Sequence, residues 1–129
     1  MRIETYFRVL NDLIAARPFV HFSNLTFEKR SSHIGFIKGE VRFSDGSILH
    51  MREYVDTEGD VERLMYVYHY QDGNGNLVFR YDNSGHHRGL STYPHHKHVG
   101  NRGEVQPAQP ASLGKILQEI GKRLSANLL

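Results

Sequence analysis

The chain has 129 residues, of which 39% are hydrophobic, and its formal net charge is only +2. This length fits one domain, so residues 1–129 are predicted to share a single core. The apolar runs are too short to cross a bilayer and the first residues lack a signal-peptide core, so we expect a cytoplasmic protein with no membrane contact. The absence of cysteine excludes disulfides and cysteine-based metal sites.

The first part of the chain has the pattern of one helix followed by a β-meander. Apolar residues recur at helical spacing over residues 2–16, and Arg17-Pro18 then ends the pattern. Segments rich in β-branched and aromatic residues follow, separated by turn sequences such as Ser44-Asp45-Gly46. About five antiparallel strands are predicted, at residues 19–31, 34–44, 47–56, 63–71 and 77–82.

The periodic pattern ends after Asn83. Residues 84–111 contain glycine, proline and histidine with neither helical nor strand periodicity, and we predict a long His-rich functional loop there. Ser112 can cap a last helix whose apolar stripe is Leu113, Ile116, Leu117, Ile120 and Leu124. The predicted fold class is therefore α+β, an antiparallel meander with an N-terminal and a C-terminal helix packed on one face.

The predicted loop concentrates residues that can do chemistry. Five of the nine histidines lie within thirteen residues: His86, His87, His95, His96 and His98. Imidazole transfers protons near neutral pH and also binds transition metals, so proton transfer or phosphate contact, a metal site, and a merely exposed basic loop are all open. We assign no metal ligands, because the histidines lack the i, i+4 spacing of a zinc helix and no closely spaced acid completes a set; a divalent ion stays an alternative.

Two charged residues occupy partly apolar strand faces. Glu53 alternates with apolar side chains in the strand predicted at residues 47–56, so it must be paired or have a raised pKa, and it is a candidate base unless it lies on an edge strand. Arg80 is placed similarly in the strand at 77–82 and is a candidate partner for Glu53, or a phosphate clamp. A stripe of tyrosines is predicted to belong to the core or its rim: Tyr66, Tyr68 and Tyr70.

Taken together, these residues resemble the signature of the TumE family, the proposed toxin half of bacterial and archaeal toxin–antitoxin pairs. The resemblance spans residues 20–99, and its most specific part is RYDNSGHH at residues 80–87 followed by PHHKH at 94–98. Glu53-Tyr54-Val55 and the tyrosine-rich strand add to it. The resemblance implies a growth-inhibiting protein that acts on RNA and is silenced by a cognate antitoxin.

If the protein cleaves RNA, a 2′-hydroxyl attacks the adjacent phosphate, which needs a base, an acid and positive charge. We predict a metal-independent reaction with His87 and His96 as base and acid in either order, and with Glu53 as an orienting carboxylate or alternative base. Further catalytic candidates are His95 and His98. Predicted phosphate or RNA contacts are Arg80, Lys97, His86 and Arg88, and predicted structural supports are Tyr81, Asp82, Asn83 and Pro94.

Other functions remain open on the sequence. A metal-dependent hydrolase would recruit Glu53 or Asp82 with two histidines. A non-catalytic module would use the loop to dock RNA, the antitoxin or a second copy of the chain, and a free sheet edge would allow a homodimer. A plain metal-binding protein is the third alternative.

Overall fold

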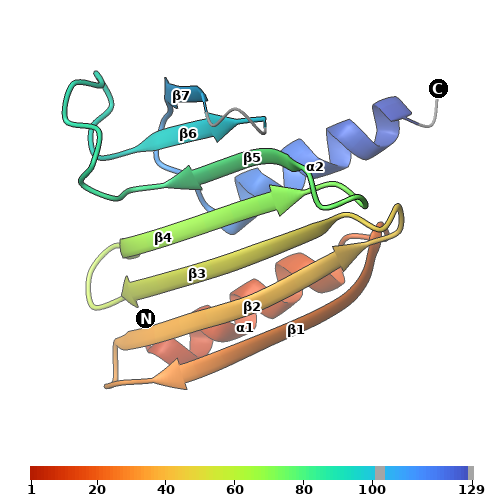
Figure 1. The fold of residues 1–129 in the computed structure, drawn as a ribbon. Coiled ribbons are helices and arrows are strands. Elements are labelled where there is room, and N and C mark those ends of the chain that lie inside the picture. Colours follow the sequence, from red (N-terminus) through yellow and green to blue (C-terminus); the bar gives the residue numbers. More distant parts are fainter. Residues whose placement is uncertain (101–103, 128–129) are drawn as a thin grey trace.

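The computed structural model describes residues 1–100 and 104–127 and shows one seven-stranded antiparallel sheet with two helices on the same face (Figure 1). The order of the strands in the sheet is their order in the sequence, so the sheet is a meander. The elements are α1 (Ile3–Ala15), β1 (Val20–Lys29), β2 (Ile34–Phe43), β3 (Ile48–Asp56), β4 (Glu62–Gln71), β5 (Leu77–Asp82), β6 (His96–Val99), β7 (Glu104–Pro107) and α2 (Leu113–Asn127).

The predicted α+β meander with both helices on one face is confirmed, but the predicted number of strands is too low. Two short strands, β6 and β7, lie inside residues 84–111, for which the sequence predicts a loop. Their sequences, His-Lys-His-Val and Glu-Val-Gln-Pro, lack the alternation of apolar residues that identifies a strand. Pairing with β5 therefore determines the conformation of β6 more than the intrinsic preference of its residues does.

The core lies between the helices and the sheet face that they cover, here called the closed face. The predicted stripe of α2 is buried, and Ser112 Oγ accepts a hydrogen bond from the backbone N–H of Lys115 at 3.4 Å, as expected for a helix cap. The predicted tyrosine stripe of β4 is also buried on the closed face. Within the described residues, neither helix is long and apolar enough to cross a membrane. The side chains that α1 buries are Ile3, Tyr6, Leu10 and Ile14.

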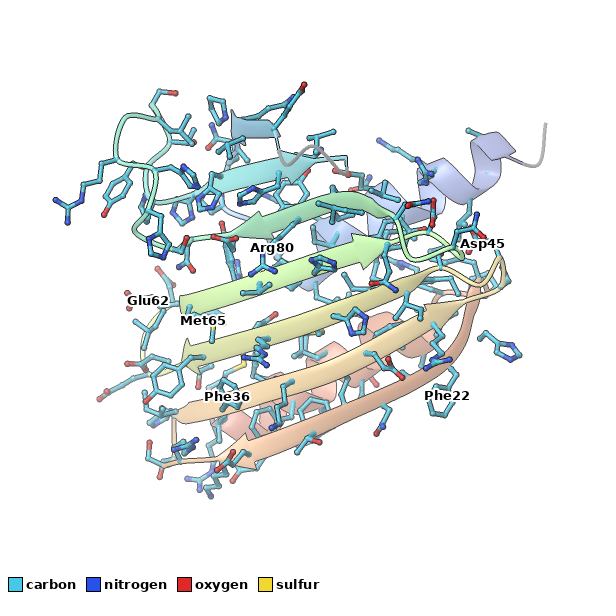
Figure 2. The ribbon with its side chains drawn as sticks, viewed as in Figure 1. Phe22, Phe36, Asp45, Glu62, Met65 and Arg80 are labelled. Atoms are coloured by element: carbon cyan, nitrogen blue, oxygen red, sulfur yellow. The ribbon has the colours of Figure 1, made fainter. Side chains whose placement is uncertain are left out.

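The opposite face of the sheet, the open face, is covered by neither α1 nor α2, and Phe36, Met65 and Arg80 lie on it (Figure 2). Strand register arranges its side chains in rows that cross the strands. One row contains Lys38, Arg52, Val67, Asp82 and His96. The neighbouring row contains Glu40, His50, His69, Arg80 and His98.

Gly39 allows the close pairing of β1 with β2. Its φ is 149°, and a Cβ built there would lie 2.0 Å from the backbone oxygen of Asn24. Gly39→Ala is therefore expected to lower the free energy of unfolding by roughly 2 kcal/mol, because β1 must shift or the backbone must be strained. Urea denaturation measures this loss. Gly59→Ala is the matched control, since a Cβ there meets nothing within 4 Å; equal losses in the two variants would contradict the prediction.

Candidate functional site

The pairing of β5 with β6 brings four polar side chains together on the open face. Asp82 is opposite His96 and Arg80 is opposite His98 in the register, so the two rows form a block of two by two where they cross β5 and β6. Alternation along each strand explains the block, because residues two apart point to the same face. The RYDN and HKH sequence motifs meet at this point.

Asp82 is the anionic centre of the block and is only 4% exposed. Its Oδ2 accepts a hydrogen bond from Arg80 Nε at 3.1 Å, and its Oδ1 accepts one from the backbone N–H of Ser84 at 3.0 Å. Burial alone would raise the pKa of Asp82, but hydrogen bonds from Ser84 and Arg80, with a smaller contribution from the charge of His96, outweigh burial and hold the pKa below its ordinary value of 3.8. Asp82 is therefore ionised at neutral pH.

His96 lies beneath the surface, with 1% of its area exposed. Its Nδ1 is 3.0 Å from the carbonyl oxygen of Pro94, and because a carbonyl only accepts, Nδ1 carries the proton of this hydrogen bond. The other nitrogen, Nε2, is 2.8 Å from Asp82 Oδ1, close enough for an ion pair if the ring is protonated. The contact lacks the direction of a hydrogen bond, however, and among the described residues Nε2 has no hydrogen-bond partner.

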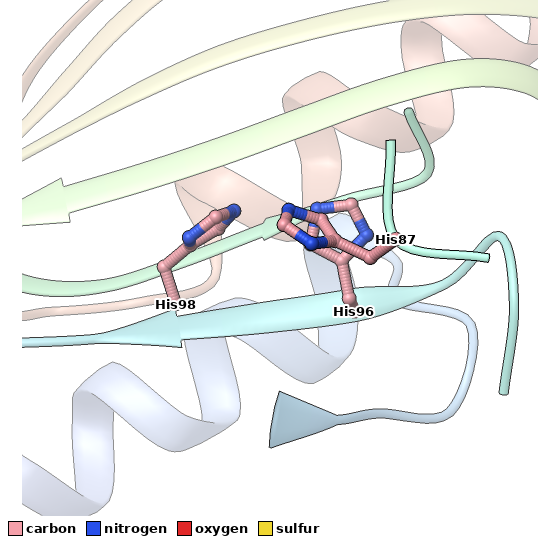
Figure 3. A group of neighbouring side chains, drawn as sticks. All are labelled: His87, His96 and His98. Atoms are coloured by element: carbon pink, nitrogen blue, oxygen red, sulfur yellow. The ribbon is translucent and has the colours of Figure 1, made fainter. Parts of the chain in front are cut away.

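His87 and His98 complete a three-histidine cluster with His96 (Figure 3). The ring centroid of His96 is 4.7 Å from that of His87 and 5.0 Å from that of His98. His98 Nε2 is also 3.7 Å from Asp82 Oδ2. Burial, with smaller contributions from the neighbouring cations, lowers the pKa of His98 below 6.5 although Asp82 opposes the shift, so this ring is neutral at pH 7. Unlike His96, both rings are partly exposed.

A groove of about 730 Å³ crosses the open face and reaches the block at Arg80. Its walls include Lys38 and Arg52, which have no ion-pair partner among the described residues, whereas the nearby Arg42 is paired with Glu40. The guanidinium of Arg80 also lies 3.4 Å from His69 Nδ1. The groove is therefore a basic channel with the three-histidine cluster beside one end. The residues that line it are Asn24, Thr26, Lys38, Gly39, Glu40, His50, Met51, Arg52, Val67, His69 and Arg80.

Several residues predicted for the site lie outside this block. His95 Nδ1 is 2.8 Å from the Tyr66 hydroxyl, and Lys97 Nζ is 3.5 Å from Glu119 Oε2 and lies over the ring of Tyr81, so both side chains contact the closed-face side of the sheet. His86 and Arg88 are exposed on the segment between β5 and β6.

Three of the predicted structural supports, Tyr81, Asn83 and Pro94, make hydrogen bonds to other residues. The Tyr81 hydroxyl donates to Glu119 Oε1 at 2.6 Å. The Asn83 side chain accepts from the Tyr66 N–H at 3.0 Å and donates to the Leu64 carbonyl at 3.2 Å, which continues the pairing of β4 beyond the end of β5. Pro94 supplies the carbonyl that orients His96.

The predicted pairing of Arg80 with Glu53 is wrong. Glu53 is fully buried on the closed face, where its carboxyl group accepts hydrogen bonds from the hydroxyls of Tyr6 and Tyr68, the second at 2.5 Å. Burial raises the pKa of Glu53, and the two hydroxyls and the charge of Arg63 oppose the shift only in part. The sheet itself separates Glu53 from the histidines, so the carboxylate next to the cluster is Asp82.

Four basic side chains of the channel were not predicted from the sequence: Lys38, His50, Arg52 and His69. A signal was present, because each of them alternates with the buried residues of its strand. In β3, for example, His50 and Arg52 alternate with Leu49, Met51 and Glu53. The residues that alternate with the buried ones in each amphipathic strand therefore predict that the second face of the sheet is polar and basic.

The comparisons with known proteins give one match. A family model described as Toxin TumE matches residues 10–124, which include the sheet, the apolar stripe of α2 and the three-histidine cluster. No curated protein and no solved structure matches the chain.

Proposed function

Because the chain belongs to the TumE toxin family, we propose that it inhibits growth by cleaving RNA, which binds along the open face and reacts at the three-histidine cluster. Membership of a toxin family also implies a cognate antitoxin. The RNA and its cleavage are the parts of this proposal that go beyond the family.

One observation carries the proposal: Arg80 and its partner Asp82 connect the basic channel to the cluster. This residue lines the groove and also holds Asp82, which contacts His96 and His98. A phosphate bound in the channel beside Arg80 is therefore next to partly exposed imidazoles. Phe22, which is 50% exposed, and Phe36 lie on the same face and offer aromatic surface on which unpaired bases can stack.

The chemistry needs only proton transfer and positive charge. His98, neutral at pH 7, takes the proton from a 2′-hydroxyl as its oxygen attacks the adjacent phosphorus. His87, in its protonated form, gives a proton to the departing 5′-oxygen, so the products are a 2′,3′-cyclic phosphate and a 5′-hydroxyl. Arg80 stabilises the charge that develops on the phosphate. His96 is too buried to reach the substrate, and we assign it to positioning the other two rings and Asp82.

A denaturing gel tests the proposal. Total RNA is incubated with untagged wild type, with His98→Ala and with His86→Ala, each stripped of metal beforehand and assayed with and without EDTA. Wild type and His86→Ala are expected to cut RNA in both conditions, whereas His98→Ala is expected to be slower by about 100-fold or more, the usual effect of a lost general base. His86 is the matched control because it is an exposed histidine of the same region but lies outside the cluster.

Equal cutting by wild type and His98→Ala, both folded, would contradict the catalytic assignment. If folded wild type binds RNA in a salt-dependent manner but releases no new ends, the open face is a binding surface without turnover.

A further inference from the structure

We infer that His87, His96 and His98 form a binding site for one divalent transition-metal ion, and that Zn²⁺ is the ion that this ligand set fits best. One ring nitrogen from each residue lies within 4.8 Å of the other two (Figure 3). Three nitrogens at about 2.0–2.1 Å from a tetrahedral zinc ion are about 3.4 Å apart, so the cluster needs a small contraction to close around an ion. His87 comes from the segment between β5 and β6 and can supply that movement.

The unpartnered nitrogen of His96 is the main support for this inference. Nε2 is buried and makes no hydrogen bond within the described part of the chain, which is costly for a polar atom unless something else occupies its lone pair. The hydrogen bond from Nδ1 to the carbonyl of Pro94 keeps the proton on the opposite side of the ring. Metal-binding histidines characteristically have this arrangement, in which a second acceptor fixes the tautomer and directs the free nitrogen at the ion.

Asp82 supplies the acid that the local sequence spacing does not. It precedes His96 by fourteen residues, yet its Oδ1 is 2.8 Å from Nε2, and Arg80 and Ser84 hold the carboxylate in place. Its negative charge offsets part of the ion's charge from a position next to the three histidines, which are the residues whose ligand atoms all lie within 4.8 Å of one another. The pairing of β6 with β5 and the contacts with Asp82 account for the positions of His96 and His98, but His87 lies outside the strands, and a shared ion would explain why its ring approaches the other two.

The donor set determines the class of metal. Three imidazole nitrogens suit zinc and its neighbours, whereas Mg²⁺ and Ca²⁺ prefer sites made of oxygen alone. The inference stands on this geometry and does not require that the protein cleave RNA. The cluster cannot bind a metal ion and transfer protons at the same time, because a nitrogen bound to metal has no lone pair for proton transfer.

The test measures binding without RNA. Untagged full-length protein is stripped with chelator, then titrated with Zn²⁺ in competition with a chromophoric chelator, and separately with Co²⁺, whose visible absorption reports tetrahedral coordination. Wild type is expected to bind one ion per chain. His87→Ala and His98→Ala are each expected to lower the affinity by about 100-fold or more, and Asp82→Asn by about tenfold.

The controls are histidines that are near in sequence but outside the cluster. His86→Ala and His95→Ala are expected to bind zinc as wild type does. Absence of stoichiometric binding by folded wild type would overturn the inference, and so would equal affinities of His87→Ala and His86→Ala. His87 is the decisive position because it lies outside the strands and helices, so its replacement leaves the core contacts intact.

Discussion

Glu53→Ala is expected to lower the free energy of unfolding by about 3–4 kcal/mol, the largest loss that we predict for a single side chain. The substitution leaves the hydroxyls of Tyr6 and Tyr68 without their acceptor inside the core, and it creates a cavity between α1 and the sheet. The half-buried charge of Arg63 also loses its nearby carboxylate. Urea denaturation followed by circular dichroism measures the loss.

Glu53→Gln is the matched variant, because it keeps an acceptor while it removes the charge. Since burial raises the pKa of Glu53 in the folded state, the folded protein retains a proton that the unfolded chain releases. The stabilising contribution of the carboxyl group is thus complete below the unfolded-state value of 4.5 and is lost as the pH rises toward the folded-state pKa. Wild type should lose stability relative to Glu53→Gln over this range; a difference that does not change with pH would contradict the prediction.

The double variant Lys38→Glu/Arg52→Glu is expected to weaken the binding of single-stranded RNA by about 100-fold at low salt. Both side chains line the basic channel without an ion-pair partner among the described residues. Reversing their charges therefore makes the electrostatic potential less positive where the phosphates are proposed to lie. Loss of two phosphate contacts should also reduce the slope of log affinity against log salt by about 1.4. Fluorescence anisotropy of a labelled RNA in a salt series measures both quantities.

A control with the same change in net charge is available on the other side of the molecule. Lys115 and Lys122 are exposed on α2, which covers the closed face. Lys115→Glu/Lys122→Glu is expected to alter RNA affinity much less and to leave the salt slope near that of wild type. If the two double variants weaken binding equally, only net charge matters and the open face is not the RNA surface.

The sequence predicts the overall fold well because each helix and each of the first five strands has its own clear period. It also identifies the region of the site, since the histidines between His86 and His98 include the whole cluster. The sequence does not show the register between neighbouring strands, and so it does not show which of their side chains share a face of the sheet. A shift of one residue in register moves every side chain of a strand to the other face, so Glu53 and Arg80, both on partly apolar strand faces, were indistinguishable from a pair.

The sequence also does not show which side chains of the predicted loop are buried. His95, His96 and Lys97 are consecutive, but His96 faces the cluster while His95 and Lys97 contact residues on the other side of the sheet. That alternation exists only because β6 pairs with β5, and the pairing depends on contacts distant in sequence rather than on the preferences of four polar residues.

The position of β6 in the sheet has a consequence for how the protein opens. The cluster depends on a four-residue strand whose outer neighbour, β7, is equally short and forms one edge of the described sheet, whereas the apolar core lies under the longer strands. Local unfolding in proteins starts where few apolar contacts hold the backbone. Separation of β6 from β5 would therefore take Asp82 away from His96 while the remainder of the sheet stays folded, so the integrity of the cluster and the global stability of the protein are separate properties.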